Sequence, residues 1–214
     1  MRQRCTPSHG GVLFLDEICE FPRAHLEALR QPLEEHRIVI ARARGSVAMP
    51  AELTLVAAAN PCPCGHLGDP TRLCRCDARQ LNAYHRRLSG PLRDRMDLNV
   101  AVPRVPADAL LAARAPESSE AIRARVSGAR QRQAERGGLN RLLTGDRLVV
   151  ACALQPAARR MLGRAGERLG LSARGYVRVL RVARTIADLH ACDAVADTHL
   201  AEALRHRGET AVAT

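Results

Sequence analysis

The sequence contains no lysine and no tryptophan: all 33 basic residues are arginine, and aromatic residues make up 2% of the 214 positions. Without lysine it cannot contain a Gly-x-x-x-x-Gly-Lys-Ser/Thr loop, the usual cradle for nucleotide phosphates. With so few aromatic residues, alanine, valine and leucine must build the core. No apolar run approaches the ~18 residues that span a membrane, and the polar start does not resemble a secretion signal. We therefore expect a cytoplasmic location with no membrane contact.

The charge balance is strongly basic. The formal net charge is +11, which favours polyanionic partners such as nucleic acid or a bound nucleotide. Eight cysteines in a chain without a secretion signal favour metal ligands or free thiols over disulfides. The length suffices for one large domain or two small ones.

An acidic pair follows the first apolar segment. Val12 to Leu15 are apolar and predict a strand buried on both faces of a parallel sheet. Asp16 and Glu17 come directly after it, at the end of the strand where open α/β sheets hold their ligands. In a nucleoside triphosphatase the first carboxylate holds Mg²⁺ and the second can orient the attacking water. A solvated acidic turn is the alternative interpretation.

The pattern of the first half of the sequence predicts an α/β fold. We predict a helix over 22–35, kinked by Pro32, and a hairpin over 37–49. Further elements are a second buried strand over 53–59, a helix near 77–88 and a third short strand over 98–102.

The pattern of the second half predicts an entirely helical structure. Apolar periodicity predicts helices over 119–136, 155–169, 172–191 and 198–207. We therefore divide the chain into an α/β part, 1–105, with at least three strands, and an all-helical part, 106–214.

Polar residues recur at the ends of these elements. Asn60 ends the second strand, within the segment Ala-Ala-Ala-Asn-Pro. Arg93 and Arg95 precede the third strand, within Ser-Gly-Pro-Leu-Arg-Asp-Arg. Arg174 begins the helix over 172–191. Each arginine could also be an ordinary exposed charge.

In this order and spacing the motifs resemble those of the magnesium-chelatase-like AAA+ ATPases of bacteria, the ComM/YifB group associated with competence and DNA recombination. The resemblance covers about residues 10–207. It implies a P-loop-type parallel sheet followed by a helical lid, ATP and Mg²⁺ as cofactors, and a homo-oligomeric ring motor acting on DNA branches. It also implies roles for single residues: Asp16 and Glu17 as the Walker B pair, Asn60 as sensor 1, Arg95 (with Arg93 in reserve) as the arginine finger, and Arg174 as sensor 2.

The sequence departs from that family in one respect. The family's phosphate loop lies upstream of the Walker B strand, and the sequence contains none. The resemblance therefore implies a C-terminal fragment that by itself binds ATP weakly and hydrolyses it negligibly.

Four cysteines lie close together in the loop after Asn60. Cys62-Pro-Cys64 and Cys74-Arg-Cys76 form a C-x-C…C-x-C pattern that can complete a tetrahedral structural zinc site. His66 is a possible substitute ligand, while free thiols or an oxidised pair would also account for the pattern. We expect the other cysteines to be ordinary small or buried residues: Cys5, Cys19, Cys152 and Cys192.

Two other functions remain open. The arginine-rich hairpin and helices could form a non-catalytic module that binds DNA or a protein partner. Gly10 to Ile18 also fits the transcription-activator AAA+ ATPases, although the segments around Asn60 and Arg95 do not match theirs.

Overall fold

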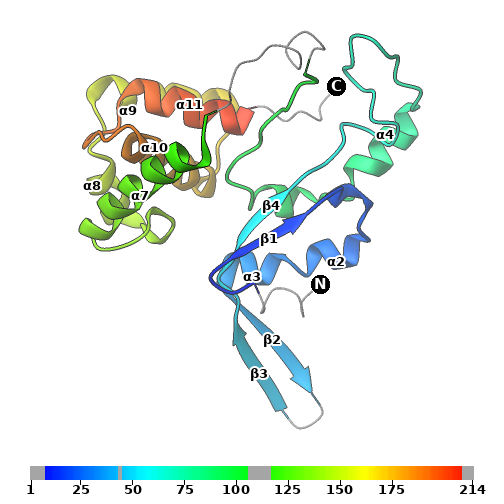
Figure 1. Ribbon diagram of the computed structural model, residues 1–214, viewed down its shortest axis with the longest axis horizontal. Coiled ribbons are helices and arrows are strands. Elements are labelled where there is room, and N and C mark those ends of the chain that lie inside the picture. The colour runs from blue at the N-terminus through cyan, green and yellow to red at the C-terminus, as the bar shows by residue number, and fades with distance from the viewer. Residues whose placement is uncertain (1–7, 43–44, 106–116, 209–214) are drawn as a thin grey trace. The chain divides into compact units, whose positions relative to one another are not determined.

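The computed structural model describes residues 8–42, 45–105 and 117–208 (Figure 1). They divide into two compact units, the first ending at Met96 and the second beginning at Asp97. The first is a mixed α/β unit with a small parallel sheet and the second is helical, as the predicted fold class requires. The predicted division at 105 and 106 adjoins a segment outside the described residues.

The parallel sheet has two strands. β1 (Val12–Leu15) pairs with β4 (Thr54–Ala57), from Val12 opposite Thr54 to Leu15 opposite Ala57. Leu13 and Leu15 are buried, whereas the side chains of Val12 and Phe14 on the other face are 61% and 58% exposed. The prediction that β1 is buried on both faces is therefore wrong for this unit, because only one face of the pair is covered by the described residues.

Two short helices replace the single helix predicted over 22–35. After the 3₁₀ turn η1 (Ile18–Glu20) come α2 (Arg23–Glu27) and α3 (Arg30–Glu35). Pro32 lies in the first turn of α3, where its missing N–H would have had no helical partner. The predicted kink is thus a complete break before the proline. Leu26 and Leu29 are buried and share a core with Leu13 and Leu15 of β1.

The predicted hairpin is confirmed. β2 (Arg37–Arg42) and β3 (Gly45–Pro50) run antiparallel, and in Figure 1 they extend away from the β1–β4 pair. Ile38 on β2 is buried in the core of the unit, while the side chains of β3 are mostly exposed.

Two helices follow β4 and the cysteine-rich loop. α4 (Ala78–His85) begins with a capping box, in which Asp77 and Gln80 each accept a hydrogen bond from the other's backbone N–H. α5 (Gly90–Arg93) is a single turn capped by Ser89. The loop between Asn60 and Asp77 contains no regular secondary structure.

The second unit consists of α7 (Ser119–Glu135), η2 (Asn140–Leu142), α8 (Gly145–Cys152), α9 (Pro156–Leu169), α10 (Ala173–Leu189) and α11 (Asp197–Gly208). All four predicted helices are confirmed, and α8 was not predicted. α10 supplies more of the buried core residues than any other helix of the unit, and it packs against α7, α8 and α11. Within the described ranges no helix has both the length and the apolar character needed to cross a membrane.

The strand predicted over 98–102 is wrong. This segment is irregular, and its apolar residues Leu98, Val100 and Val102 are 52%, 63% and 85% exposed. A strand requires a ladder of neighbouring backbone groups. Asn99 N instead donates to the carbonyl of His206 in α11, 3.0 Å away.

Candidate functional site

The ends of the two parallel strands bring the predicted polar residues to one edge. Pairing continues beyond the strands, since Ala58 N donates to Leu15 O and Ile18 N donates to Ala58 O, both at 2.9 Å. Asp16 and Glu17 therefore leave β1 beside the segment that leads from β4 to Asn60. All three polar residues are exposed at this edge.

Glu17 has an unusual backbone conformation. Its φ of 49° and ψ of 47° are left-handed, and its N–H donates to Asp16 Oδ1 at 3.0 Å. This conformation costs a residue with a Cβ roughly 1–2 kcal/mol. Such outliers cluster at functional sites, where the surroundings enforce them. Here the next residues, Ile18 and Cys19, are buried, which holds the turn at Glu17 in place.

Arg95 is folded against its own unit. Its side chain is 9% exposed, forms an ion pair with Glu34 of α3, and donates from Nη1 to Pro91 O at 2.6 Å. Its Nε is buried and has no hydrogen-bond partner. Glu34 is 46% exposed, so its carboxylate faces solvent while the Arg95 guanidinium is largely covered.

An open groove of roughly 480 Å³ lies between α2, α4 and α5. Arg23, Arg86 and Arg93 contribute to its lining, together with His85 and Ser89. Sequence reasoning did not assemble this cluster, because its members come from three separate segments. Arg87 has a structural role instead, donating to Cys19 O at 2.7 Å and pairing with Glu20 at 2.8 Å.

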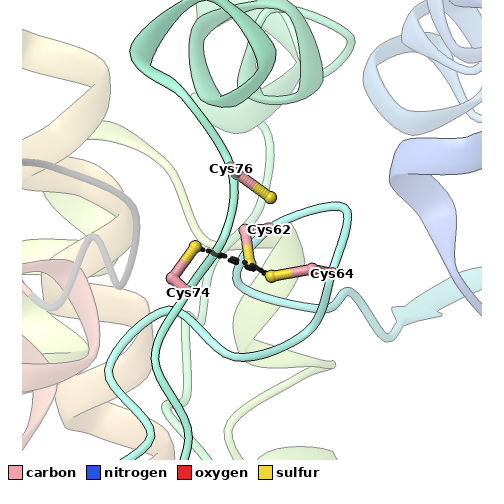
Figure 2. Close-up of side chains that lie close together, drawn as sticks. All are labelled: Cys62, Cys64, Cys74 and Cys76. Carbon is pink, nitrogen blue, oxygen red and sulfur yellow. Dashed lines mark hydrogen bonds between the residues drawn. The ribbon is translucent and has the colours of Figure 1, made fainter.

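The four clustered cysteines converge in the loop after β4 (Figure 2). The Sγ atom of Cys62 lies 3.4 Å from that of Cys64 and 3.7 Å from that of Cys74. The Sγ atoms of Cys64 and Cys74 are 3.6 Å apart, and all four Sγ atoms, including that of Cys76, lie within 4.8 Å of one another. A metal ion could be held here.

Backbone hydrogen bonds and removal from water shift the pKa values of these thiols in opposite directions. Bonds from the backbone of Arg75 and His66 lower the pKa of Cys64 to about 6. Removal from water raises the pKa of Cys76 to about 12.

The other cysteines lie outside the cluster. Cys19 and Cys152 are buried, as expected, and Cys192 is half-buried. Cys5 lies outside the described residues.

Comparison with known proteins identifies the family. The model of the magnesium chelatase ChlI subunit matches residues 4–110, and the model of the C-terminal region of that subunit matches residues 116–207. The chain belongs to the magnesium chelatase ChlI family. This confirms the resemblance that the ordered motifs suggest.

Within this family the chain is similar to proteins of the ComM/YifB type. It is 43% identical to competence protein ComM of Haemophilus influenzae, over 92% of the chain and 39% of that protein. It is 42% identical to YifB of Escherichia coli, over 94% of the chain and 40% of that protein. An uncharacterised Mycobacterium tuberculosis protein is 44% identical over 85% of the chain. The chain therefore spans about two fifths of the length of the ComM and YifB relatives.

The predicted sensor arginine of this ChlI-family chain lies in the helical unit. Arg174 is an exposed residue in the first turn of α10, directly after the cap formed by Ser172. Arg178 and Arg181, about one and two turns further along α10, are held by contacts within the unit. Arg178 pairs with Asp97 at 3.8 Å, and Arg181 donates to Leu143 O at 2.9 Å. Of the three, Arg174 extends most openly into solvent.

Proposed function

We propose that this chain is the Walker B, sensor and lid portion of an ATP-hydrolysing AAA+ subunit of the ComM/YifB type. The observation that supports the proposal is that Asp16 and Glu17 directly follow β1 and Asn60 follows β4 by three residues, at the carboxyl ends of the two paired strands. Open α/β sheets bind their ligands outside this edge. In the proposal Asp16 holds Mg²⁺, Glu17 orients the attacking water, and Asn60 binds the γ-phosphate or that water.

The site is completed from a second subunit. A ring of identical subunits would place Arg95 of one copy near the γ-phosphate held by the next, where it stabilises the charge of the transition state. In the isolated chain Arg95 is paired with Glu34, which is half exposed. To act as a finger, Arg95 would exchange Glu34 for the triphosphate, so that its charge stays paired throughout.

DNA is the proposed partner of the ring. The net charge of +11 attracts polyanions, and the relative from Haemophilus influenzae is named a competence protein. Work on DNA branches during recombination would be the purpose of ATP hydrolysis. The lid arginine, Arg174, would contact the nucleotide as sensor 2.

The phosphate cradle must come from sequence outside this chain, because the chain contains no lysine. The residues present can position a metal ion, a water molecule and positive charge, but they provide no loop around the β- and γ-phosphates. We therefore expect the chain alone to show no ATP turnover above background. A turnover within the common enzyme range of ~1–10³ s⁻¹ would contradict this expectation.

The test restores the phosphate cradle. The chain is fused behind the preceding segment of Escherichia coli YifB, and ATP hydrolysis is measured with and without branched DNA. Glu17→Gln and Arg95→Ala should each lower turnover by about 10³-fold, the scale of losing a finger, while ATP binding persists. Glu35→Gln, an exposed acidic residue paired with Arg37, is the matched control and should leave turnover unchanged. Loss of activity in Arg93→Ala but not in Arg95→Ala would move the finger to Arg93.

A non-catalytic binding module is the second candidate function, favoured by the arginine-lined groove. Under this alternative the fusion would bind DNA without hydrolysing ATP, and Glu17→Gln would change neither property. Arg86→Ala together with Arg23→Ala would then weaken DNA binding.

A further inference from the structure

We propose that Cys62, Cys64, Cys74 and Cys76 bind one zinc ion, and that this ion fastens the end of β4 to the start of α4. The inference does not depend on nucleotide hydrolysis. It rests on sulfur geometry, on a backbone hydrogen bond and on the composition of the loop.

The sulfur spacing fits a tetrahedral zinc site. With a Zn–S distance of about 2.3 Å, the sulfurs of a regular ZnS₄ tetrahedron lie about 3.8 Å apart. The pairs formed by Cys62, Cys64 and Cys74 are separated by 3.4, 3.7 and 3.6 Å. A disulfide would require about 2.05 Å, and all four of these cysteines are free.

A backbone group favours a thiolate at this site. Leu67 N donates to Cys62 Sγ at 3.3 Å. Hydrogen bonds to a charged group stabilise its charged form. Soft thiolates arranged in a tetrahedron select zinc over magnesium or calcium.

The loop itself has little else to hold it. In the loop from Asn60 to Asp77 one apolar residue is buried, which is Cys62. The large apolar side chain of Leu73 is 90% exposed. A long loop without regular structure needs a function or a cross-link. Small segments that cannot build a core are commonly held by a metal. A zinc ion would provide that cross-link here.

The position of the cluster suggests what the ion would organise. Cys62 follows Asn60 by two residues, and Cys76 directly precedes Asp77, the cap of α4. An ion bound by both ends of the loop would fix the strand end that carries Asn60. It would also fix the first turn of α4. The C-terminal residues of that helix line the arginine groove.

The first experiment measures the metal directly. The full chain is purified under reducing conditions and its metal content is determined by mass spectrometry. We expect about one zinc per chain, as a closed four-thiolate site requires. Cys62→Ser and Cys74→Ser should each lose most of it, and Cys192→Ser, outside the cluster, should retain it. Zinc retained in both cluster variants, or iron in place of zinc, would overturn the proposal.

A second measurement uses the unmodified chain, because a cluster variant could fail to fold. Thiol titration of the native protein is compared before and after a strong zinc chelator is added. The four cluster thiols should react slowly before the chelator is added and rapidly afterwards. Zinc should be released at the same rate as the thiols become reactive. Substitution by cobalt should give the thiolate charge-transfer absorption of a tetrahedral site. Four thiols that react at once, with no metal released, would establish the free-thiol alternative.

Discussion

The packing of α9 against α10 provides a sharp test of the helical unit. Gly166 of α9 is buried, and a Cβ added there would lie 1.4 Å from Oη and 2.2 Å from Cζ of Tyr176. Gly163 lies one turn earlier on the same helix, and a Cβ there would meet nothing within 4 Å. Tyr176 follows Arg174 by two residues, so this contact also orients the first turn of α10.

The two substitutions should have opposite effects on the free energy of unfolding. Gly163→Ala should stabilise the unit by about 0.5–1 kcal/mol through helix propensity alone. In Gly166→Ala the Tyr176 ring must move by about 2 Å to restore ordinary contact, and overpacking of this kind costs about 1–3 kcal/mol. After the helical gain of about 0.5–1 kcal/mol is subtracted, we expect a net destabilisation of up to about 2.5 kcal/mol.

The assay is urea unfolding followed by tyrosine fluorescence. The sequence has two tyrosines and no tryptophan, so Tyr84→Phe leaves Tyr176 as the reporter of the helical unit. The midpoint should fall in Gly166→Ala and rise in Gly163→Ala. When Tyr176→Ala is combined with each glycine variant, unfolding is followed by circular dichroism. The two double variants should then have similar unfolding midpoints. If Gly166→Ala were as stabilising as Gly163→Ala, the described packing would be refuted.

Three further predictions concern buried and exposed charges. Arg184 is fully buried and pairs with Asp188 at 3.1 Å. It also donates to the carbonyls of Ala151, Cys192 and Asp193. Arg184→Met should therefore lower the free energy of unfolding in urea by about 3–5 kcal/mol, whereas Arg174→Ala, at an exposed position, should change it by less than ~0.5 kcal/mol. His199 accepts a bond from Ala196 N at Nδ1 (3.1 Å), and burial lowers its pKa. Because the unfolded chain takes up this proton first, the stability of the helical unit should fall as pH drops below ~6.5, and His199→Asn should flatten that dependence between pH 7 and 5. Finally, Glu34→Ala should destabilise the α/β unit by about 1–3 kcal/mol, because Arg95 is 9% exposed and loses its charge partner. It should leave turnover of the YifB fusion at least as high, and a large drop in turnover would show that Glu34 positions Arg95.

Much of the fold could be predicted because its patterns are local. The hairpin over 37–49 and the long helices show clear periodicity, and β1 and β4 are compact apolar segments bounded by polar residues. α8 was missed because it is only eight residues long and begins at glycine. The strand over 98–102 has the composition of a strand, but the described part of the chain pairs its backbone with α11 rather than with a sheet.

The candidate site could be predicted where it follows from topology. The ends of neighbouring parallel strands share an edge, so Asp16, Glu17 and Asn60 could be grouped from the sequence. The partner of Arg95 could not, because Glu34 lies 61 residues away and the two meet only in the folded unit. The arginine groove could not be predicted either, because its residues come from separate segments that meet only in the folded unit.

In the proposed ring, Arg95 of one subunit and the acidic strand end of the next form the two halves of one ATP site. The most direct measurement mixes two inactive variants of the YifB fusion, Glu17→Gln and Arg95→Ala, and follows ATP hydrolysis. In a mixed ring the intact carboxylates of the Arg95→Ala copy meet the intact finger of the Glu17→Gln copy, so we expect the mixture to recover activity that neither variant has alone. A mixture as inactive as its components, under conditions where mixed oligomers form, would contradict the account.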